Sequence, residues 1–296
     1  MNRKIVMTLC VIVLGVLFIP CTRYALAETT GATKSVVNID GQEQLAFYLD
    51  GKLYIKLRDV LELFDGDKND LVDFNGKSKS VILKSNTGDV RLKKYIKINS
   101  LKDNESIMPL KSPHKIMINI DSVDKGKINV EVKGLQMYLL KESNYVPLSE
   151  ICEIYGLSVK EEGKEISIYT DKSKKDYEKE FIFNNQTVKY KNLDLEIFKD
   201  KPSTFRVVGE LRHNILELLS KNITKDVPKE LLKNAPDNKS VIITLSSEGK
   251  EKIEFLIIPE NKVNDKYYIT YKIGKDEAQN KFLKSNISEK ILESIK

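Results

Sequence analysis

The sequence predicts an α+β protein in which two small strand-helix-hairpin lobes form a mixed-sheet domain and a second, antiparallel α+β domain follows. Three observations lead to this prediction. A short amphipathic pattern occurs twice at a spacing of 91 residues, and short β-branched segments surround both copies. A charged stretch at 171–180, poor in apolar residues, then separates these copies from a segment with a different pattern.

The repeated pattern lies at 54–64 and again at 145–156, and in each copy it predicts a short helix. The apolar residues of each copy fall at i, i+3, i+4 and i+7, which is one face of a helix. They are Leu57, Val60, Leu61 and Phe64 in the first copy, and Leu148, Ile151, Cys152 and Tyr155 in the second. Pro147 is suited to the start of the second helix and Gly156 to its end.

Each predicted helix has an extended segment before it and a hairpin after it, with the hairpin turns at 75–76 and 162–163. Isolated helices shorter than about 12–15 residues are marginal in water, so each helix has to pack on the sheet made by its flanking strands. Two copies are too few for a solenoid and indicate a paired-lobe domain. Segments 89–98, 115–120 and 127–132 are predicted strands that complete a mixed sheet shared by both lobes.

The second copy, "YVPLSEICEIYGLSVKEEGKEISIY", resembles the small repeat of the copper amine oxidase-like N-terminal (stalk) domains of secreted bacterial proteins. The first copy, "LYIKLRDVLELF" with "VDFNGKSKSVIL", resembles a variant of the same repeat, and the resemblance covers residues 36–172. The chain departs from the family pattern at Lys56, Ser149, Phe74 and Glu161, where proline, arginine and, twice, tryptophan are usual. The resemblance implies a non-catalytic module of cell-surface and secreted proteins of Gram-positive bacteria.

Residues 1–27 have the three parts of a signal peptide. Arg3 and Lys4 give a positive start, 5–19 is apolar, and Ala25-Leu26-Ala27 is a small-residue cleavage site. A retained membrane anchor is the alternative. We expect a secreted or cell-wall-associated protein that meets a membrane only through this segment, before cleavage.

The remaining chain divides by composition into four parts. They are a mobile leader at 28–35, the duplicated stalk-like domain at 36–172, a linker at 173–180 and a C-terminal α+β domain of no recognised family at 181–296. In the last domain the pattern predicts a hairpin over 181–190 and a helix over 210–221.

Net charge limits the kinds of partner to expect, and cysteine content limits the possible disulfides. The formal net charge of +6 includes three cations and no acid from the signal peptide, so the mature chain is only mildly basic, which argues against a nucleic-acid partner. Lysine-rich pieces at 91–97 and 172–175 are typical of a solvated strand and a linker, or of weak attraction to anionic wall polymers. Cys152 is the only cysteine left after cleavage, which excludes an intramolecular disulfide.

No residue is assigned to a catalytic, cofactor-binding or metal-ligating role. The two histidines, His114 and His213, are too few for a copper site. His213 has Glu210 and Glu217 three residues before and four after it on one predicted helix, which suggests a solvated face with charge pairs or, alternatively, an acid–base site. Six aromatic residues could form a sugar- or peptide-binding face, or alternatively the core side of strands. These are Phe47, Tyr48, Tyr54, Tyr267, Tyr268 and Tyr271.

The sequence therefore predicts an exported, non-catalytic binding or spacer protein, cell-surface or wall-associated, that displays a C-terminal α+β domain. Its expected partner is a cell-wall polymer or another surface protein, and no cofactor is expected. Two alternatives stay open: a wall-directed enzyme with its site in 181–296, and an extracellular ligand-sensing protein.

Overall fold

The computed structural model describes residues 31–39, 42–61, 63, 72–83, 96–122, 126–162, 165–169, 179–198, 203–228, 241–247, 250–257, 262–263 and 265–296. The predicted signal peptide and most of the predicted linker at 173–180 lie outside these residues. Strand β1 begins at Ala32, inside the segment predicted as a leader, because residues 32 and 33 already pair with β6. No helix in the described part of the chain is both long and apolar enough for a membrane span.

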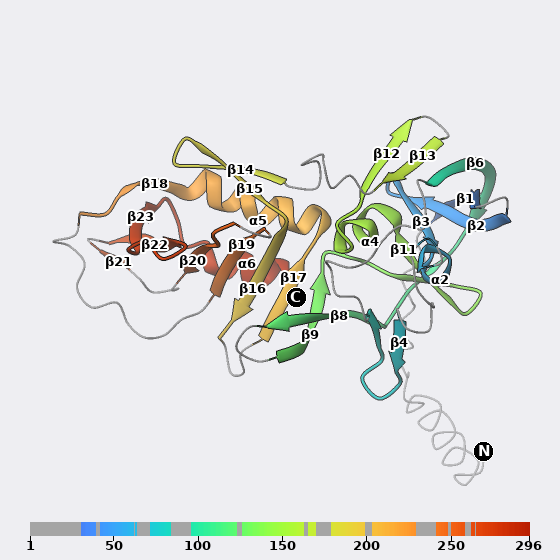
Figure 1. Cartoon of the computed structure of the whole chain (residues 1–296), viewed down its shortest axis with the longest axis horizontal. Coiled ribbons are helices and arrows are strands. Elements are labelled where there is room, and N and C mark those ends of the chain that lie inside the picture. The colour runs from blue at the N-terminus through green and yellow to red at the C-terminus, as the bar shows by residue number, and fades with distance from the viewer. Residues whose placement is uncertain are drawn as a thin grey trace, which may run out of the picture.

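Most of the described residues belong to two large sheets (Figure 1). The nine-stranded sheet contains, in order, β12 (Ser158–Glu162), β13 (Glu165–Tyr169), β6 (Ile96–Ile107), β1 (Ala32–Ile39), β2 (Gln42–Leu49), β3 (Lys52–Lys56), β11 (Ser143–Pro147), β10 (Tyr138–Leu140) and β7 (Leu110–Lys111). All of its pairings are antiparallel.

The twelve-stranded sheet is mixed, because β5 pairs with β8 and β9 with β17 in the parallel sense. Its strands in order are β18 (Ile223–Asp226), β23 (Gln279–Leu283), β22 (Lys266–Ile273), β20 (Ile253–Ile257), β19 (Val241–Ser246), β16 (Asn192–Ile197), β17 (Ser203–Val207), β9 (Gly126–Lys133), β8 (Lys115–Ser122), β5 (Ser80–Leu83) and β4 (Val72–Asn75), with β21 (Lys262–Val263) beside β22. The fold is α+β with strands dominant, which confirms the predicted class in outline.

Two hairpin-helix units contribute four adjacent strands of the nine-stranded sheet, between β1 and the edge strand β7. The hairpin β2–β3 leads into α2 (Leu57–Leu61), and the hairpin β10–β11 leads into α4 (Leu148–Ile154). Both hairpins turn through two residues with positive φ, at 50–51 and at 141–142, which is the turn whose twist matches a hairpin. Strands β3 and β11 pair with each other, and Ile55 lies opposite Val146.

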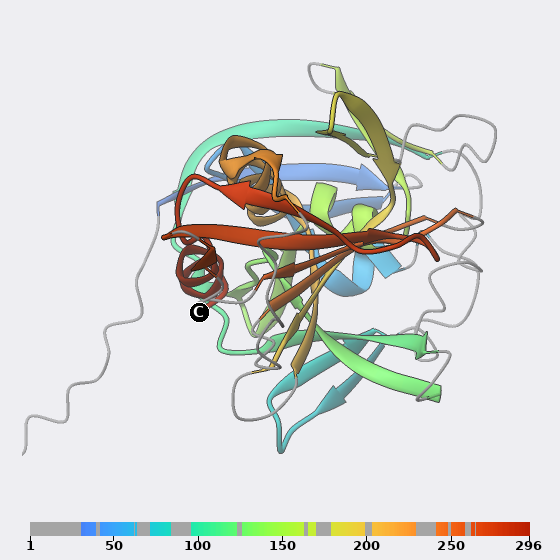
Figure 2. The ribbon, with the colours of Figure 1, turned by 90° about the vertical axis from the view of Figure 1, so that its left-hand side faces the viewer.

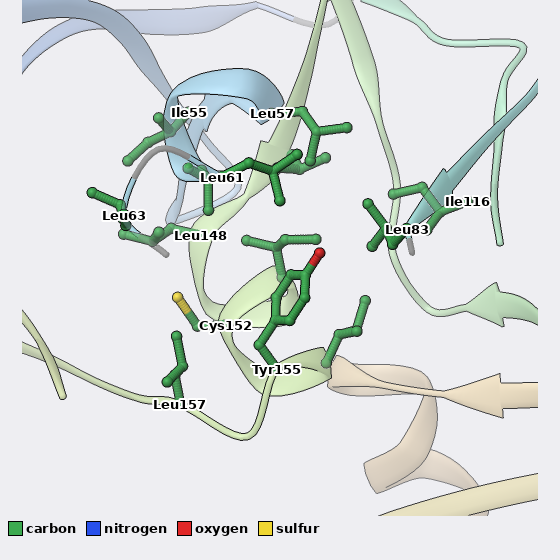
Figure 3. Close-up of a cluster of buried hydrophobic side chains, with 14 of the residues drawn as sticks. Ile55, Leu57, Leu61, Leu63, Leu83, Ile116, Leu148, Cys152, Tyr155 and Leu157 are labelled. Carbon is green, nitrogen blue, oxygen red and sulfur yellow. The ribbon is translucent and has the colours of Figure 1, made fainter. Parts of the chain in front are cut away.

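Both helices bury apolar residues of their predicted faces in one core, and Phe64 of the first face lies outside the described residues. Figure 3 shows Leu57 and Leu61 near Leu148, Cys152 and Tyr155, and this cluster extends to Leu83 and Ile116 of the twelve-stranded sheet. Each fully buried leucine or isoleucine contributes about 1.5–3 kcal/mol, so the core is large enough to order helices this short. Gly156 ends α4 with a φ of +68°, as the sequence predicts.

Strands β8 and β9 correct one prediction. The sequence suggested that segments 115–120 and 127–132 complete a sheet shared by the two lobes, but they belong to the sheet that runs on into the C-terminal part. The cause lies in the last three residues of β9, 131–133, which pair in parallel with 205–207 of β17. Hydrogen bonding therefore continues from residues before the predicted boundary at 173–180 to residues after it.

The remaining elements are the hairpin β14 (Lys179–Phe183) and β15 (Gln186–Tyr190), the helix α5 (Gly209–Asn222) and the C-terminal helix α6 (Ser288–Ser294). This is the hairpin predicted over 181–190, and it turns at Asn184 and Asn185, which both have positive φ. Figures 1 and 2 show this hairpin beside α5 in two perpendicular views. Phe181 and Phe183 fix it there by packing on Phe255, while Ile215 and Leu219 of α5 enter the same core.

The junction of β9 with β17 depends on Gly134. The amide of Val208 donates a 3.0 Å hydrogen bond to the carbonyl of Lys133, and Gly134 follows with a φ of +90°. A Cβ on Gly134 would lie 2.1 Å from the carbonyl oxygen of Val208. Only glycine therefore fits this position.

The substitution Gly134→Ala is expected to destabilise the protein more than Gly51→Ala does, by about 1–3 kcal/mol. Both glycines have positive φ, but a Cβ on Gly51 meets no atom within 4 Å, so that variant loses only the backbone preference of about 1–2 kcal/mol. Urea unfolding of the two variants measures the difference. Equal losses would show that the close contact at Val208 relaxes without cost.

Candidate functional site

A cleft of about 690 Å³ lies between the β14–β15 hairpin and α5. Residues 179–182 of β14 form one wall, and the outer face of α5 from Gly209 to Ser220 forms the other. Glu150 and Glu153 of α4 close one end. The cleft therefore joins an element of the first part of the chain to two elements of the C-terminal part.

The end wall is a network of buried charges. Glu153 forms an ion pair with Arg212, and the amide of Gly209 donates a 3.4 Å hydrogen bond to Glu153 Oε2. Glu150 Oε1 lies 2.8 Å from the Nζ of Lys52, and Ser149 Oγ donates to Glu150 Oε2 at 2.7 Å. These carboxylates face the N-terminus of α5, where the helix dipole favours negative charge.

Burial changes the acidity of the network. It raises the pKa of Glu153, although Arg212, Lys179 and the amide of Gly209 all act to lower it. Burial also raises the pKa of Tyr190 to about 12, and the guanidinium of Arg212 lies 6.0 Å from the centre of the Tyr190 ring. Glu153 therefore holds a proton more tightly than an ordinary glutamate does.

The residues suspected from the sequence occupy the α5 wall. Glu210, His213 and Glu217 all line the cleft from the exposed face of the helix. Glu217 forms an ion pair with Lys221, four residues later, and the hydrogen bond from that lysine lowers the pKa of Glu217. The arrangement is that of a solvated helix face with a charge pair.

Sequence reasoning missed Glu150, Glu153 and Arg212. It considered only Glu210, His213 and Glu217 on α5 and gave the polar residues of α4 no role, but all but 20% of the Glu153 side chain is buried, and Arg212 is buried too. A charged residue within each helix gives no sign of a partner 59 positions away, from 153 to 212. In the described part of the chain, the pairing of β9 with β17 places the start of α5 beside α4.

His114 and Cys152, the other residues considered from the sequence, both pack against neighbouring side chains. His114 Nδ1 lies 3.2 Å from Asn144 Oδ1, and the centres of the His114 and Phe74 rings lie 5.1 Å apart in a T-shaped arrangement. Cys152 is fully buried, and burial raises the pKa of its thiol far above the usual range. Among the described residues, no group of three or more His, Cys, Asp and Glu side chains could hold a metal ion.

The aromatic binding face suggested by the sequence is wrong for most of its members. Phe47 and Tyr54 stack with ring centres 5.0 Å apart in a buried cluster with Tyr138 and Tyr145. Tyr268 and Tyr271 are buried in the C-terminal part. Strand alternation placed these rings inside, so they have no face to offer a ligand.

Comparison with known protein families, with curated proteins and with solved structures finds no match to this chain.

The substitution Arg212→Leu is expected to lower the unfolding free energy by about 3–5 kcal/mol at neutral pH, because it leaves Glu153 buried without its cation. The cost should shrink as the pH falls, since the raised pKa of Glu153 rises further without Arg212 and protonation then removes the unpaired charge. Urea unfolding between about pH 4 and pH 8 measures this dependence.

Lys221→Leu is the matched control. It removes the partner of the exposed Glu217 on the same helix, and a pair between exposed side chains contributes little to stability. An equally small, pH-independent effect of Arg212→Leu would show that the end wall is not held by its ion pair.

Proposed function

We propose that this chain is an exported, non-catalytic binding or spacer protein whose first part is a duplicated, stalk-like module. The observation that carries the proposal is the pairing of β3 with β11. The bounds of these strands differ by 91 residues at both ends, from 52 to 143 and from 56 to 147, and Ile55 pairs with Val146. Ile55 and Val146, which the sequence repeat relates, thus lie directly opposite each other. The pairs on either side cross over, Tyr54 with Pro147 and Lys56 with Tyr145, as expected of two copies related by a local two-fold axis.

The surroundings of that pair support the duplication. Phe47 and Tyr138 are related by the same spacing, as are Tyr54 and Tyr145, and all four belong to one aromatic cluster. On the other side of the sheet, Leu57 and Leu148 occupy the start of the two helices in one core. A duplicated module of this kind is consistent with the stalk-like resemblance of residues 36–172.

The charges of the cleft support a binding or spacer role. Glu150 and Glu153, the two most enclosed carboxylates of the cleft, contact Lys52 and Arg212, so they connect structural elements. The twelve-stranded sheet continues from the first part into the C-terminal part through β9 and β17. A single connected body with a cleft on its side suits a protein that holds something at a surface.

Export and wall retention test this proposal. Expressed in a Gram-positive host, the protein is expected in the medium or the wall fraction with Glu28 at its N-terminus. Purified protein should bind isolated walls at low salt and be released near 1 M salt, where charges are screened beyond about 3 Å. A variant with Lys174→Glu and Lys175→Glu is the control for simple charge attraction. Recovery only from the cytoplasm would contradict export, and no retention at low salt would contradict wall binding.

A wall-directed enzyme is the second candidate, because His213 and Glu217 line the same cleft as Glu153, whose pKa is raised. Our proposal expects no release of soluble fragments from purified walls above the background of buffer alone. Release that is lost in His213→Ala or Glu217→Ala, and kept in Glu293→Ala on the exposed side of α6, would favour the enzyme instead.

A further inference from the structure

We propose that the cleft between β14 and α5 binds an extended, basic peptide segment, which pairs with β14 as a third strand. The inference rests on the proposed binding role and names the class of partner. Three properties of the described residues carry it: the edge of β14, the length of the walls and the charge of the lining.

Within the described part of the chain, the outer edge of β14 has no partner strand. Among the described residues β14 pairs only with β15, in the register from Lys179 opposite Tyr190 to Phe183 opposite Gln186. A two-residue turn makes the flanking pair, Phe183 and Gln186, a hydrogen-bonded pair, and such pairs alternate along the ladder. The N–H and C=O groups of Glu180 and Ile182 therefore point away from β15.

The side chains of β14 match this arrangement. Phe181 is buried in the core below the hairpin, whereas Ile182 is 69% exposed and lines the cleft. A large apolar side chain left in the open beside an unpaired strand edge is unusual, because natural edges are normally protected by charge, proline or a bulge. An added strand would cover it.

The dimensions suit a short extended peptide. The α5 wall runs from Gly209 to Ser220, which is about 16 Å along a helix. An extended chain covers that distance in about five residues. Figures 1 and 2 show the hairpin following the side of α5, so a peptide between them can contact the strand edge and the helix together.

The lining selects a basic peptide. Glutamates outnumber cations, with Glu150, Glu153, Glu180, Glu210 and Glu217 against Lys179 and Arg212. Arg212 is paired with Glu153, and Glu150, Glu180 and Glu217 pair with Lys52, Lys189 and Lys221. These three lysines are not among the residues that line the cleft, so the lining itself presents more carboxylates than cations. The aromatic rings that line the cleft, Phe181 and Tyr190, are buried and offer no open face on which a sugar ring could stack. Charge and shape together therefore favour a peptide with lysine or arginine over a glycan.

Strand addition can be tested with a fluorescein-labelled peptide of about six residues in which lysine and valine alternate. Its binding to the purified protein is followed by fluorescence anisotropy at low salt. The comparison peptides replace lysine by glutamate, or carry backbone N-methyl groups on the lysines only or on the valines only. Chitohexaose serves as the glycan probe.

The expected result is binding of the lysine peptide, with little binding of the glutamate peptide or of chitohexaose. Only one of the two N-methylated peptides should lose affinity, because alternate residues of a strand face opposite edges. Loss of two or three backbone hydrogen bonds should weaken binding by about tenfold or more. This alternation separates strand addition from simple charge attraction.

On the protein, Ile182→Pro is the decisive variant and Ile182→Thr its control. Proline removes the outward N–H without disturbing the pairs with β15, and threonine keeps that N–H. Ile182→Pro should weaken binding by about fivefold or more, and Ile182→Thr should weaken it less. Circular dichroism checks the fold of both, and if Ile182→Pro unfolds, the N-methylated peptides decide.

No binding of the lysine peptide up to about 1 mM, the weak end of specific recognition, would overturn the proposal. So would equal affinity of both N-methylated peptides, or tighter binding of chitohexaose. Each of these outcomes leaves export and wall retention untouched, so the two proposals fail separately.

Discussion

The short parallel pairing of β9 with β17 is the constraint on which the rest of the structure depends. It is only three residues long, yet it continues the twelve-stranded sheet from the first part of the chain into the C-terminal part. Gly134 directly follows β9 and lies against the carbonyl of Val208. Helix α5 begins at Gly209, the residue after Val208. The pairing thus sets α5 against α4, and without that contact the cleft would have no end wall.

The Glu153–Arg212 ion pair contributes little net free energy to folding, because transferring both charges out of water costs about as much free energy as their attraction provides. Its effect is better described as orientation. A buried guanidinium paired with a single carboxylate restricts how the two helices can be arranged, and the hydrogen bond from the Gly209 amide restricts the arrangement further. The raised pKa of Glu153 is the sign of this enclosure.

Local structure was predictable because it follows from local chemistry. The spacing of Leu148, Ile151 and Cys152 specifies α4, and the Asn184-Asn185 pair specifies the β14–β15 turn. The neighbours of a strand were not predictable in this way. Alternation of Ile128, Val130 and Val132 indicates a strand with one buried face, but it carries no information about which edge meets β17. The enclosed part of the site depends on that pairing, so only its exposed residues on α5 could be anticipated.

The distance along the chain between the partners at this junction has a kinetic consequence. Residue 131 pairs with residue 205, and residue 55 with residue 146. Each of these pairings can form only after a long loop between its two strands has closed. Chains rich in such distant contacts fold slowly, since loop closure comes before the contacts that reward it. Under the export proposed above, the chain would expose its sheet edges during that interval.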